Sequence, residues 1–212
     1  MFLRSTIRGK DAPSRSGDAA PPWELEELDT LRRALLVATS RGVIEAYRLG
    51  RGNRVRFGRN VIANHRLVIR GPGRVLVGDR VNLYAFGGRT RLVARTPGAV
   101  IRIGENSRLN GPHLQADTLI EIGPRCILGQ CHILDTDMHS LALDRRTNPL
   151  AEVRTAPVVL EENVWVARGA AILPGVRIGR DSVIGYGSVV AADVPPGVVA
   201  AGNPARVIRE LD

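Results

Sequence analysis

Aromatic side chains are few in this sequence and make up 4% of its 212 residues. Any core must therefore be built mainly from aliphatic side chains. The shortage also argues against nucleic-acid binding, because proteins that hold single strands stack the bases on aromatic side chains, and the arginines here are dispersed rather than clustered. We expect no nucleic-acid partner.

Cysteine is scarce too, with Cys126 and Cys131 the two in the chain. They lie outside any metal-binding or redox motif, so we interpret both as small residues in or near the core. This count is typical of a cytosolic protein.

Long apolar runs are missing as well. No stretch approaches the roughly 18 apolar residues that suggest a transmembrane helix. The opening "MFLRSTIRGK" lacks the apolar segment of a signal peptide. We therefore expect no transmembrane segment and a cytoplasmic location.

Acidic residues are outnumbered: 30 Lys and Arg against 21 Asp and Glu give a net charge of +9. Two interpretations stay open. The excess can be a solvated, arginine-rich surface, or it can attract an anionic partner such as a nucleotide-bearing cofactor, an acidic polysaccharide or a membrane face.

A six-residue repeat dominates the second half of the chain. Aliphatic residues recur every six positions at Leu160, Val166, Ile172, Ile178, Ile184 and Val190. A small or aliphatic residue follows the first five of these by four positions, at Val164, Ala170, Val176, Ser182 and Ser188. Neither an amphipathic helix nor a plain strand has this period. It is typical of short strands and turns that coil, with three walls per coil and coils stacked about 4.8 Å apart.

Three motifs add a resemblance to this period: "NVW" at Asn163–Trp165, "ILPGV" at Ile172–Val176 and "AGNPARVIRE" at Ala201–Glu210. With them the chain resembles the hexapeptide-repeat acyltransferases over roughly residues 55–210. It is most similar to galactoside and maltose O-acetyltransferases and to enzymes that O-acetylate bacterial polysaccharides. The resemblance implies an all-β fold, a left-handed parallel β-helix.

The chain is expected to divide into four parts. Residues 1–22 predict a mobile arm, and residues 23–54 a helical cap over the open end of the coil, with a break at Gly42. Residues 55–192 predict the β-helix, irregular in its early coils and interrupted at about 134–157 by an ejected loop without the period. Residues 193–212 are expected to form a short tail, partly helical from Ala205 to Glu210.

His139, in "DTDMHS" at the start of this loop, is the candidate base. The resemblance implies this role, since the family's catalytic histidine precedes the loop. A sugar hydroxyl is a poor nucleophile at neutral pH, and a histidine can accept its proton. Because the thioester of acetyl-CoA is already activated, direct attack suffices.

The other reacting groups follow from the same resemblance. Asn110, in "GENSRLNG", matches an asparagine whose amide can donate to an oxyanion or to the acceptor, although a stacked corner asparagine is the alternative. Asp117 matches an acidic position of the family and is a candidate for acceptor binding, and Asp135 and Asp137 could either orient His139 or bind the acceptor. Trp165 is expected to face outward, at the acceptor and the coenzyme or at a subunit interface.

The expected coenzyme site combines matches and departures. Its candidate residues are Trp165, Ala167, Arg168, Gly185, Tyr186, Arg206 and Arg209. Tyr186 stands where many relatives have a small residue, and Ala191 and Ala192 stand where many have a Thr-Lys pair that reaches the CoA phosphates. Arg168 is a candidate to supply the missing charge.

The resemblance thus implies a homotrimeric O-acetyltransferase. It would move an acetyl group from acetyl-CoA to a sugar hydroxyl, in a polysaccharide or glycolipid, without a metal. Two alternatives remain. One is a non-catalytic β-helix scaffold that has lost CoA binding. The other is a zinc-dependent, carbonic anhydrase-like protein with His113, His132 and His139 as ligands.

Overall fold

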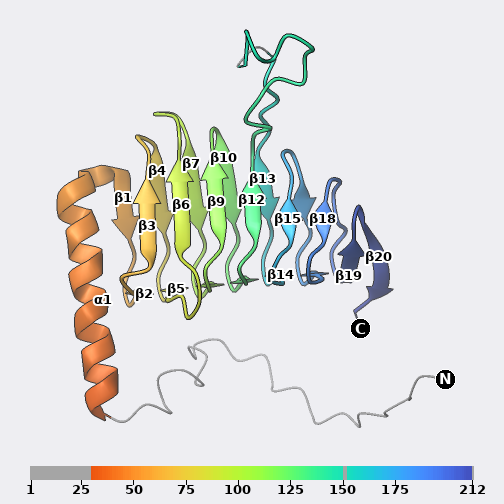
Figure 1. Cartoon of the computed structure of the whole chain (residues 1–212). Coiled ribbons are helices and arrows are strands. Elements are labelled where there is room, and N and C mark those ends of the chain that lie inside the picture. The colour runs from red at the N-terminus through yellow and green to blue at the C-terminus, as the bar shows by residue number, and fades with distance from the viewer. Residues whose placement is uncertain (1–29, 150–151, 212) are drawn as a thin grey trace.

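The computed structural model describes residues 30–149 and 152–211, which form one helix packed on the end of a parallel β-helix (Figure 1). The helix α1 covers Thr30–Arg51 and is followed by a short 3₁₀ helix, η2, at Gly52–Arg54. The expected mobile arm and the first part of the expected helical cap lie outside the described residues. The helix runs through Gly42 without a break, so that expectation was wrong.

Three parallel sheets form the walls of the coil. Sheet A contains β1 (Val55–Phe57), β4 (Arg74–Val77), β7 (Val100–Ile103), β10 (Leu119–Ile122), β13 (Val158–Leu160) and β16 (Arg177–Ile178). Sheet B contains β2 (Ile62–Ala63), β5 (Asn82–Leu83), β8 (Arg108–Leu109), β11 (Ile127–Leu128), β14 (Trp165–Val166), β17 (Val183–Ile184), β19 (Val198–Gly202) and β20 (Ala205–Glu210). Sheet C contains β3 (Leu67–Arg70), β6 (Thr90–Ala94), β9 (His113–Ala116), β12 (His132–Leu134), β15 (Ala171–Ile172) and β18 (Val189–Val190). This is the β-helix expected from the sequence.

Strand register shows where the repeat is strict. Val159 pairs with Arg177, which lies three repeats farther along the chain, the length of one ideal coil. Earlier coils are longer, since Val75 pairs with Ile101, more than four repeats later. The extra residues lie in the corners, so the walls stay paired although the six-residue rhythm is lost.

The core is a set of aliphatic columns inside the coil. Each anchor of the repeat from Leu160 to Val190 is at most 1% exposed. The serines of the repeat are buried as well, and their hydroxyl groups are satisfied. Ser182 donates to the Pro195 carbonyl at 2.7 Å, and Ser188 accepts from the Gly202 N–H at 3.1 Å. Burying one Ile or Leu side chain contributes about 1.5–3 kcal/mol, so the columns are the main source of stability.

Glycine follows some of the buried strand ends, such as Ile178 and Ile103, and close approach between coils requires it there. A Cβ on Gly179 would collide with the backbone of Pro196, and one on Gly104 would lie 2.5 Å from the backbone of Gly123. Any larger residue would push the coils apart at this corner.

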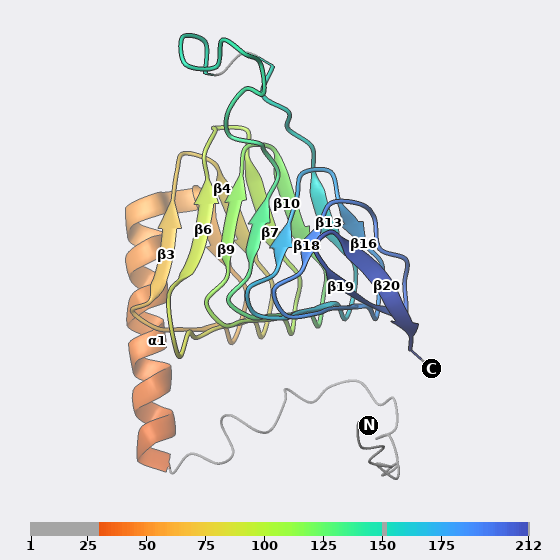
Figure 2. The same cartoon turned by 45° about the vertical axis from the view of Figure 1, so that its right-hand side comes forward.

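Helix α1 closes the first coil (Figures 1 and 2). Ile44 is buried against the core, and Val43 and Tyr47 pack beside it. Ser40 Oγ donates to the Ala63 carbonyl at 2.8 Å and accepts from the Ala63 N–H at 3.1 Å. These contacts satisfy backbone groups that would otherwise be unpaired at the sheet edge. In the described part of the chain, no helix is both long and apolar enough to span a bilayer.

The tail differs from its expected form. Residues Ala205–Glu210 form the strand β20, which pairs antiparallel with β19, and not a helix. The turn after Gly202 sends the chain back along β19, where its backbone groups find partners. The last parallel strand of sheet B is thereby covered.

Between β12 and β13 the chain leaves the coil, and we call its described residues there, 135–149 and 152–157, the inserted loop. Figure 1 shows it projecting beyond the ends of the strands. Its base is a narrow ribbon in which Thr136 bridges Thr155 and the Asp137 N–H donates to the Arg154 carbonyl at 3.0 Å. Farther out, Leu141 and Leu143 are 81% and 98% exposed.

Candidate active site

The outer face of sheet C lies between two corners that carry most of the candidate residues. Asn110 lies at the corner between sheets B and C, just before β9. His139 lies beyond the other end, after β12. A four-residue strand such as β9 is roughly 13 Å long. Within one chain, therefore, the two candidate catalytic residues lie at opposite ends of this wall.

His139 is exposed at the base of the inserted loop. Its neighbour Met138 attaches this base to sheet C, since the Gln115 side-chain amide contacts Met138 Sδ at 3.3 Å. Gln115 is buried under this contact. His139 thus lies next to the point where the inserted loop contacts sheet C, and its imidazole is accessible to a substrate.

Asp135 is fully committed to the corner between sheets C and A. Its buried carboxylate accepts from the backbone N–H groups of Asp117, Thr118 and Leu119 at 2.7–2.8 Å, and from the Thr118 hydroxyl at 2.9 Å. Both oxygens are occupied, so Asp135 fixes the corner from which the inserted loop departs. Of the two aspartates considered for orienting His139, Asp137 is the one with a free carboxylate among the described contacts.

Asp117 lies at this same corner. Its Oδ1 makes an ion pair with Arg95 Nε at 3.1 Å. Burial raises the pKa of Asp117, the charge of Arg95 opposes the rise, and the nearby Asp135 adds to it. The corner nearest His139 therefore holds a partly buried carboxyl group that an acceptor hydroxyl could contact, the role expected from the sequence.

Asn110 has its side-chain oxygen engaged. It accepts from the Phe86 N–H of the preceding coil at 3.1 Å. This is the stacking contact of a corner asparagine, and it leaves the NH₂ group as the donor that a reacting oxygen could use. The structural and the catalytic interpretations are therefore compatible.

The candidate coenzyme residues gather on the last coils. Trp165 is 49% exposed on the outer face of sheet B, in register with Val183 of the next coil. Ala167 and Arg168 follow it at the corner between sheets B and C. Gly185 and Tyr186 occupy the same corner one coil later, because three repeats separate Tyr186 from Arg168.

The remaining coenzyme candidates lie beside these. Arg206 pairs with Ala201 and Arg209 with Val199, on the strand that extends sheet B. Arg168, Tyr186 and both β20 arginines are exposed. The structure therefore assembles a basic surface of exposed arginines beside Trp165 and Tyr186. Ala191 and Ala192, in contrast, follow β18 at the other end of sheet C. Arg168 therefore does not occupy the position of the Thr-Lys pair that these alanines replace.

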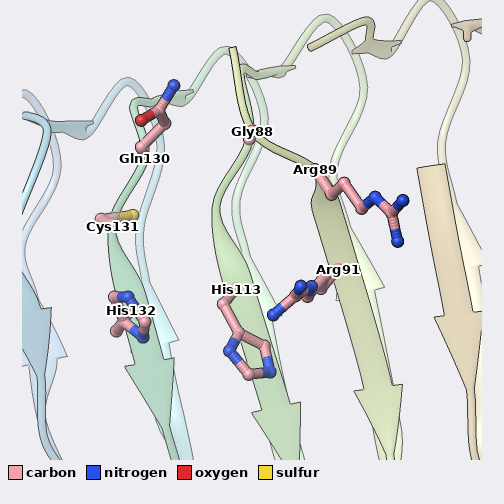
Figure 3. A pocket seen from close by; sticks show the side chains of 8 residues that line it. Gly88, Arg89, Arg91, His113, Gln130, Cys131 and His132 are labelled. Atoms are coloured by element: carbon pink, nitrogen blue, oxygen red, sulfur yellow. The ribbon is translucent and has the colours of Figure 1, made fainter. Parts of the chain in front are cut away.

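A pocket that sequence reasoning did not identify opens on the outer face of sheet C (Figure 3). It is lined by Gly88, Arg89, Arg91, Gly111, His113, Gln130, Cys131 and His132. The rings of His113 and His132 meet edge to face with their centroids 5.6 Å apart. The sequence signal for this pocket is the spacing of the two histidines, which equals one ideal coil plus one corner residue. At this spacing the two histidines pair on neighbouring strands and their side chains lie side by side.

The pocket histidines bear on the zinc alternative. His113 and His132 come together, but in the described ranges no three His, Cys, Asp or Glu side chains are arranged to hold a metal ion. Burial lowers the pKa of His113, and the charges of His132 and Arg91 lower it further. At neutral pH the His113 ring is therefore neutral and can donate or accept a hydrogen bond.

The two cysteines are core residues, as expected. Burial raises the pKa of Cys126 to about 11 and that of Cys131 to about 12. Both thiols are therefore protonated at neutral pH and inert as nucleophiles.

Comparisons with known proteins agree with the fold. Residues 157–192 match the family model described as bacterial transferase hexapeptide (six repeats). The galactoside O-acetyltransferase of Escherichia coli (strain K12) is 39% identical over 116 residues, which are 54% of this chain and 56% of that protein. The corresponding enzyme of Lactococcus lactis is 42% identical over 96 residues, 45% of each protein. The chain thus spans about half the length of the curated relatives it matches.

Two solved structures extend the likeness to most of the chain. A hexapeptide-repeat acetyltransferase from Vibrio cholerae, complexed with acetyl-CoA, aligns with a TM-score of 0.56 and 25% identity over 92% of each chain. A galactoside acetyltransferase in complex with coenzyme A aligns with a TM-score of 0.55 and 25% identity over 86% of this chain and 80% of that one. The chain therefore carries the repeat of the bacterial hexapeptide transferases, and its resemblance to the hexapeptide-repeat acyltransferases is confirmed.

Proposed function

We propose that the chain is an O-acetyltransferase that moves an acetyl group from acetyl-CoA to a hydroxyl group of a sugar, within a polysaccharide or glycolipid. The observation that carries the proposal is the position of His139. It is exposed at the base of the inserted loop, and Met138 holds this base against sheet C. Removal of a proton from a hydroxyl requires a general base in a fixed position, and the contact of Met138 with sheet C fixes the segment that carries His139.

The reaction needs one base and one oxyanion donor. His139 takes the proton of the sugar hydroxyl as its oxygen attacks the thioester carbonyl. The Asn110 NH₂ group donates to the oxyanion of the tetrahedral intermediate. When the intermediate collapses, the ester forms, the carbon–sulfur bond breaks, and the CoA thiolate takes the proton from His139.

The separation of the two residues supports a homotrimer. Asn110 and His139 lie at opposite ends of sheet C in one chain, so a single copy cannot present both to one acetyl group. A cyclic assembly brings one corner of each copy against the other corner of its neighbour. In our proposal the active sites therefore lie between subunits.

Coenzyme binding is assigned to the last coils. Arg168, Arg206 and Arg209 would bind the phosphates, because guanidinium groups form strong, paired hydrogen bonds with phosphate oxygens. Trp165 and Tyr186 would line the path of the pantetheine arm. Two similar structures are complexes with acetyl-CoA and with CoA, which supports this assignment.

One feature favours a second candidate function. Ala191 and Ala192 cannot contribute the charge expected from a Thr-Lys pair, so a scaffold that kept the fold and lost the coenzyme remains an alternative. Asp117, Asp137 and Trp165 would then have no acceptor to bind.

The two candidates differ in a thiol-release assay. The full chain is mixed with acetyl-CoA and a panel of mono- and oligosaccharides, and free CoA is followed with a thiol reagent. An acetyltransferase releases thiol faster with at least one sugar than without any. A scaffold gives the same slow release throughout and shows no binding of CoA by calorimetry. That second result would overturn the proposed function.

A further inference from the structure

The pocket on sheet C differs from the rest of the candidate site in its charge. Its lining contains two arginines, two histidines and a glutamine, and no acidic side chain. Arginines elsewhere on the coil have a carboxylate partner, as Arg95 has Asp117 and Arg80 has Glu105. Within the described residues, Arg91 makes no such pair. The pocket therefore presents an uncompensated positive charge.

The side chains of the pocket converge from three neighbouring strands. Figure 3 shows Arg91 of β6 extended toward His113 of β9, with His132 of β12 on the other side of His113. Arg89 points away from the histidines and contributes at the rim. These strands pair in register, so the row from Arg91 through His113 to His132 is fixed by the sheet.

One part of the pocket is lined by Gly88, Gly111 and Gln130. The Gln130 side chain, which lines the pocket, donates to the Gly87 carbonyl at 2.5 Å. A Cβ on Gly111 would lie 3.0 Å from this carbonyl oxygen and 3.1 Å from Gln130 Cγ. A side chain at this position would crowd Gly87 and Gln130, and Gly111 also has a φ of +80°, which favours glycine. The cavity has a volume of about 290 Å³, near the lower limit of ligand pockets, and so suits one sugar ring better than a whole coenzyme.

Charge and position together indicate an anionic ligand. A guanidinium group with two imidazoles beside it matches the oxygens of a carboxylate or phosphate group. The pKa of His113 is lowered in the empty pocket by burial and by the charges of His132 and Arg91. An anion bound between them would offset these charges and favour the protonated ring.

The place of the pocket favours the acceptor over the coenzyme. It lies on β6, β9 and β12, whereas the candidate coenzyme arginines lie on the later coils around β14, β19 and β20. His113 and Gln115 stand two positions apart on β9, and Gln115 contacts the loop residue that precedes His139. The pocket and the candidate base therefore share the outer face of one sheet.

We propose that Arg91, His113 and His132 form a subsite for a carboxylate or phosphate group carried by the acceptor. The acceptor is then an acidic sugar, such as a uronic acid or a sugar phosphate. This inference rests on the proposed acetyl transfer for its meaning as an acceptor subsite. The binding of an anion itself does not depend on that transfer.

Matched acceptors test the specificity. Acetyl transfer by the full chain is measured with methyl glucuronide, glucose 6-phosphate and uncharged methyl glucoside. We expect a KM about tenfold to a hundredfold lower for one of the charged acceptors, the size of one charge-assisted contact. The better of the two shows whether a carboxylate or a phosphate is recognised. Equal KM values for all three would overturn the proposal.

A pair of variants locates the effect. Arg91→Gln should remove the preference for the charged acceptor. Arg56→Gln, at an exposed position on β1 of sheet A, should keep it. Circular dichroism confirms that both variants retain the β-helix. If Arg91→Gln instead raises the KM of acetyl-CoA and leaves the acceptor preference intact, the pocket binds the coenzyme and the proposal is wrong.

A binding measurement separates this inference from the proposed function. The His113 ring is followed by NMR over pH, without acetyl-CoA, in the presence of glucuronate, inorganic phosphate or glucose. We expect glucuronate or phosphate to raise the His113 pKa and glucose to leave it unchanged. If an anion raises the pKa but no sugar is acetylated, the anion subsite stands and the proposed function fails. No change with either anion would overturn the subsite.

Discussion

At the scale of single residues, the candidate chemistry depends on side chains whose polar atoms are not used by the fold. Asp135 is excluded as the residue that orients His139, because its carboxylate accepts four hydrogen bonds at the corner between sheets C and A. Asn110 is half committed, since its oxygen accepts from Phe86 and its NH₂ group remains. His139 is exposed. This difference between used and unused polar atoms is what the sequence alone does not reveal.

The role of His139 can be measured by removing its imidazole. His139→Ala should lower kcat by roughly 10²–10⁴, the usual contribution of a general base, and leave the circular dichroism of the β-helix intact. His65→Ala, at an exposed position on the first coil, is the matched control and should keep wild-type turnover. Activity within a few-fold of wild type in His139→Ala would exclude this residue as the base.

The charge on the last coils predicts how acetyl-CoA is held. Arg168→Ala removes an exposed guanidinium group one coil before Tyr186, and charge-assisted contacts to phosphate contribute about 1.5–3 kcal/mol each. We expect the KM of acetyl-CoA to rise about tenfold to a hundredfold, with a smaller change in kcat. Added salt should weaken CoA binding more in the wild type than in the variant.

Steady-state kinetics at two ionic strengths check this prediction, with Arg56→Ala as the control for loss of one exposed positive charge. An unchanged KM in Arg168→Ala would mean that this arginine is a surface charge. Arg206 and Arg209 would then be the next residues to test.

At the scale of elements, the two ends of the coil are closed in different ways. At the first coil, α1 supplies side chains to unpaired backbone groups: the Tyr47 hydroxyl donates to the Leu67 carbonyl at 2.9 Å and accepts from the Ile69 N–H at 3.1 Å. At the last coil, β20 folds back on β19. Both devices protect the edges against pairing with other chains.

The cap predicts a measurable loss of stability. Tyr47→Phe leaves two backbone groups of β3 without a partner, which should cost about 1–3 kcal/mol. The measurement is the midpoint of chemical denaturation. Tyr84→Phe is the control, because the described contacts of Tyr84 include a ring contact with Phe86 and no bond from its hydroxyl. Equal midpoints for the two variants would mean that the Tyr47 hydroxyl adds nothing to the stability of the cap.

The elements also show which parts of the fold the sequence could predict. A strict period from Leu160 to Val190 predicts the walls, because each anchor must point inward in every coil. The early coils are harder, since their corners hold extra residues, and the stacking of His113 on His132 is hidden by a spacing one longer than the ideal coil. The tail was expected to be partly helical, but Ala205–Glu210 pairs with β19, a contact set by the turn that follows Gly202.

At the scale of the whole molecule, one chain carries Asn110 at one end of sheet C and His139 at the other. Leu141 and Leu143 of the inserted loop are also exposed in one chain. Contact with a neighbouring copy would bury them and bring His139 of one chain near Asn110 of the next. The assembly is therefore part of the proposed mechanism.

Light scattering after size exclusion measures the assembly. For a trimer we expect three times the 22.9 kDa mass of one chain at micromolar concentration. Leu143→Asp should shift the population toward smaller species if the loop packs on a neighbour. A wild-type mass of one chain at this concentration would remove the basis for sites between subunits.

The most direct test of the proposed function is the fate of the acetyl carbon. The full chain is incubated with acetyl-CoA labelled with carbon-13 at the carbonyl and with the sugar that releases thiol fastest, and the product is examined by NMR. Transfer predicts an ester carbonyl resonance coupled to a sugar ring proton, formed in step with free CoA and nearly absent with His139→Ala. Labelled acetate alone, or unchanged acetyl-CoA, would contradict the account.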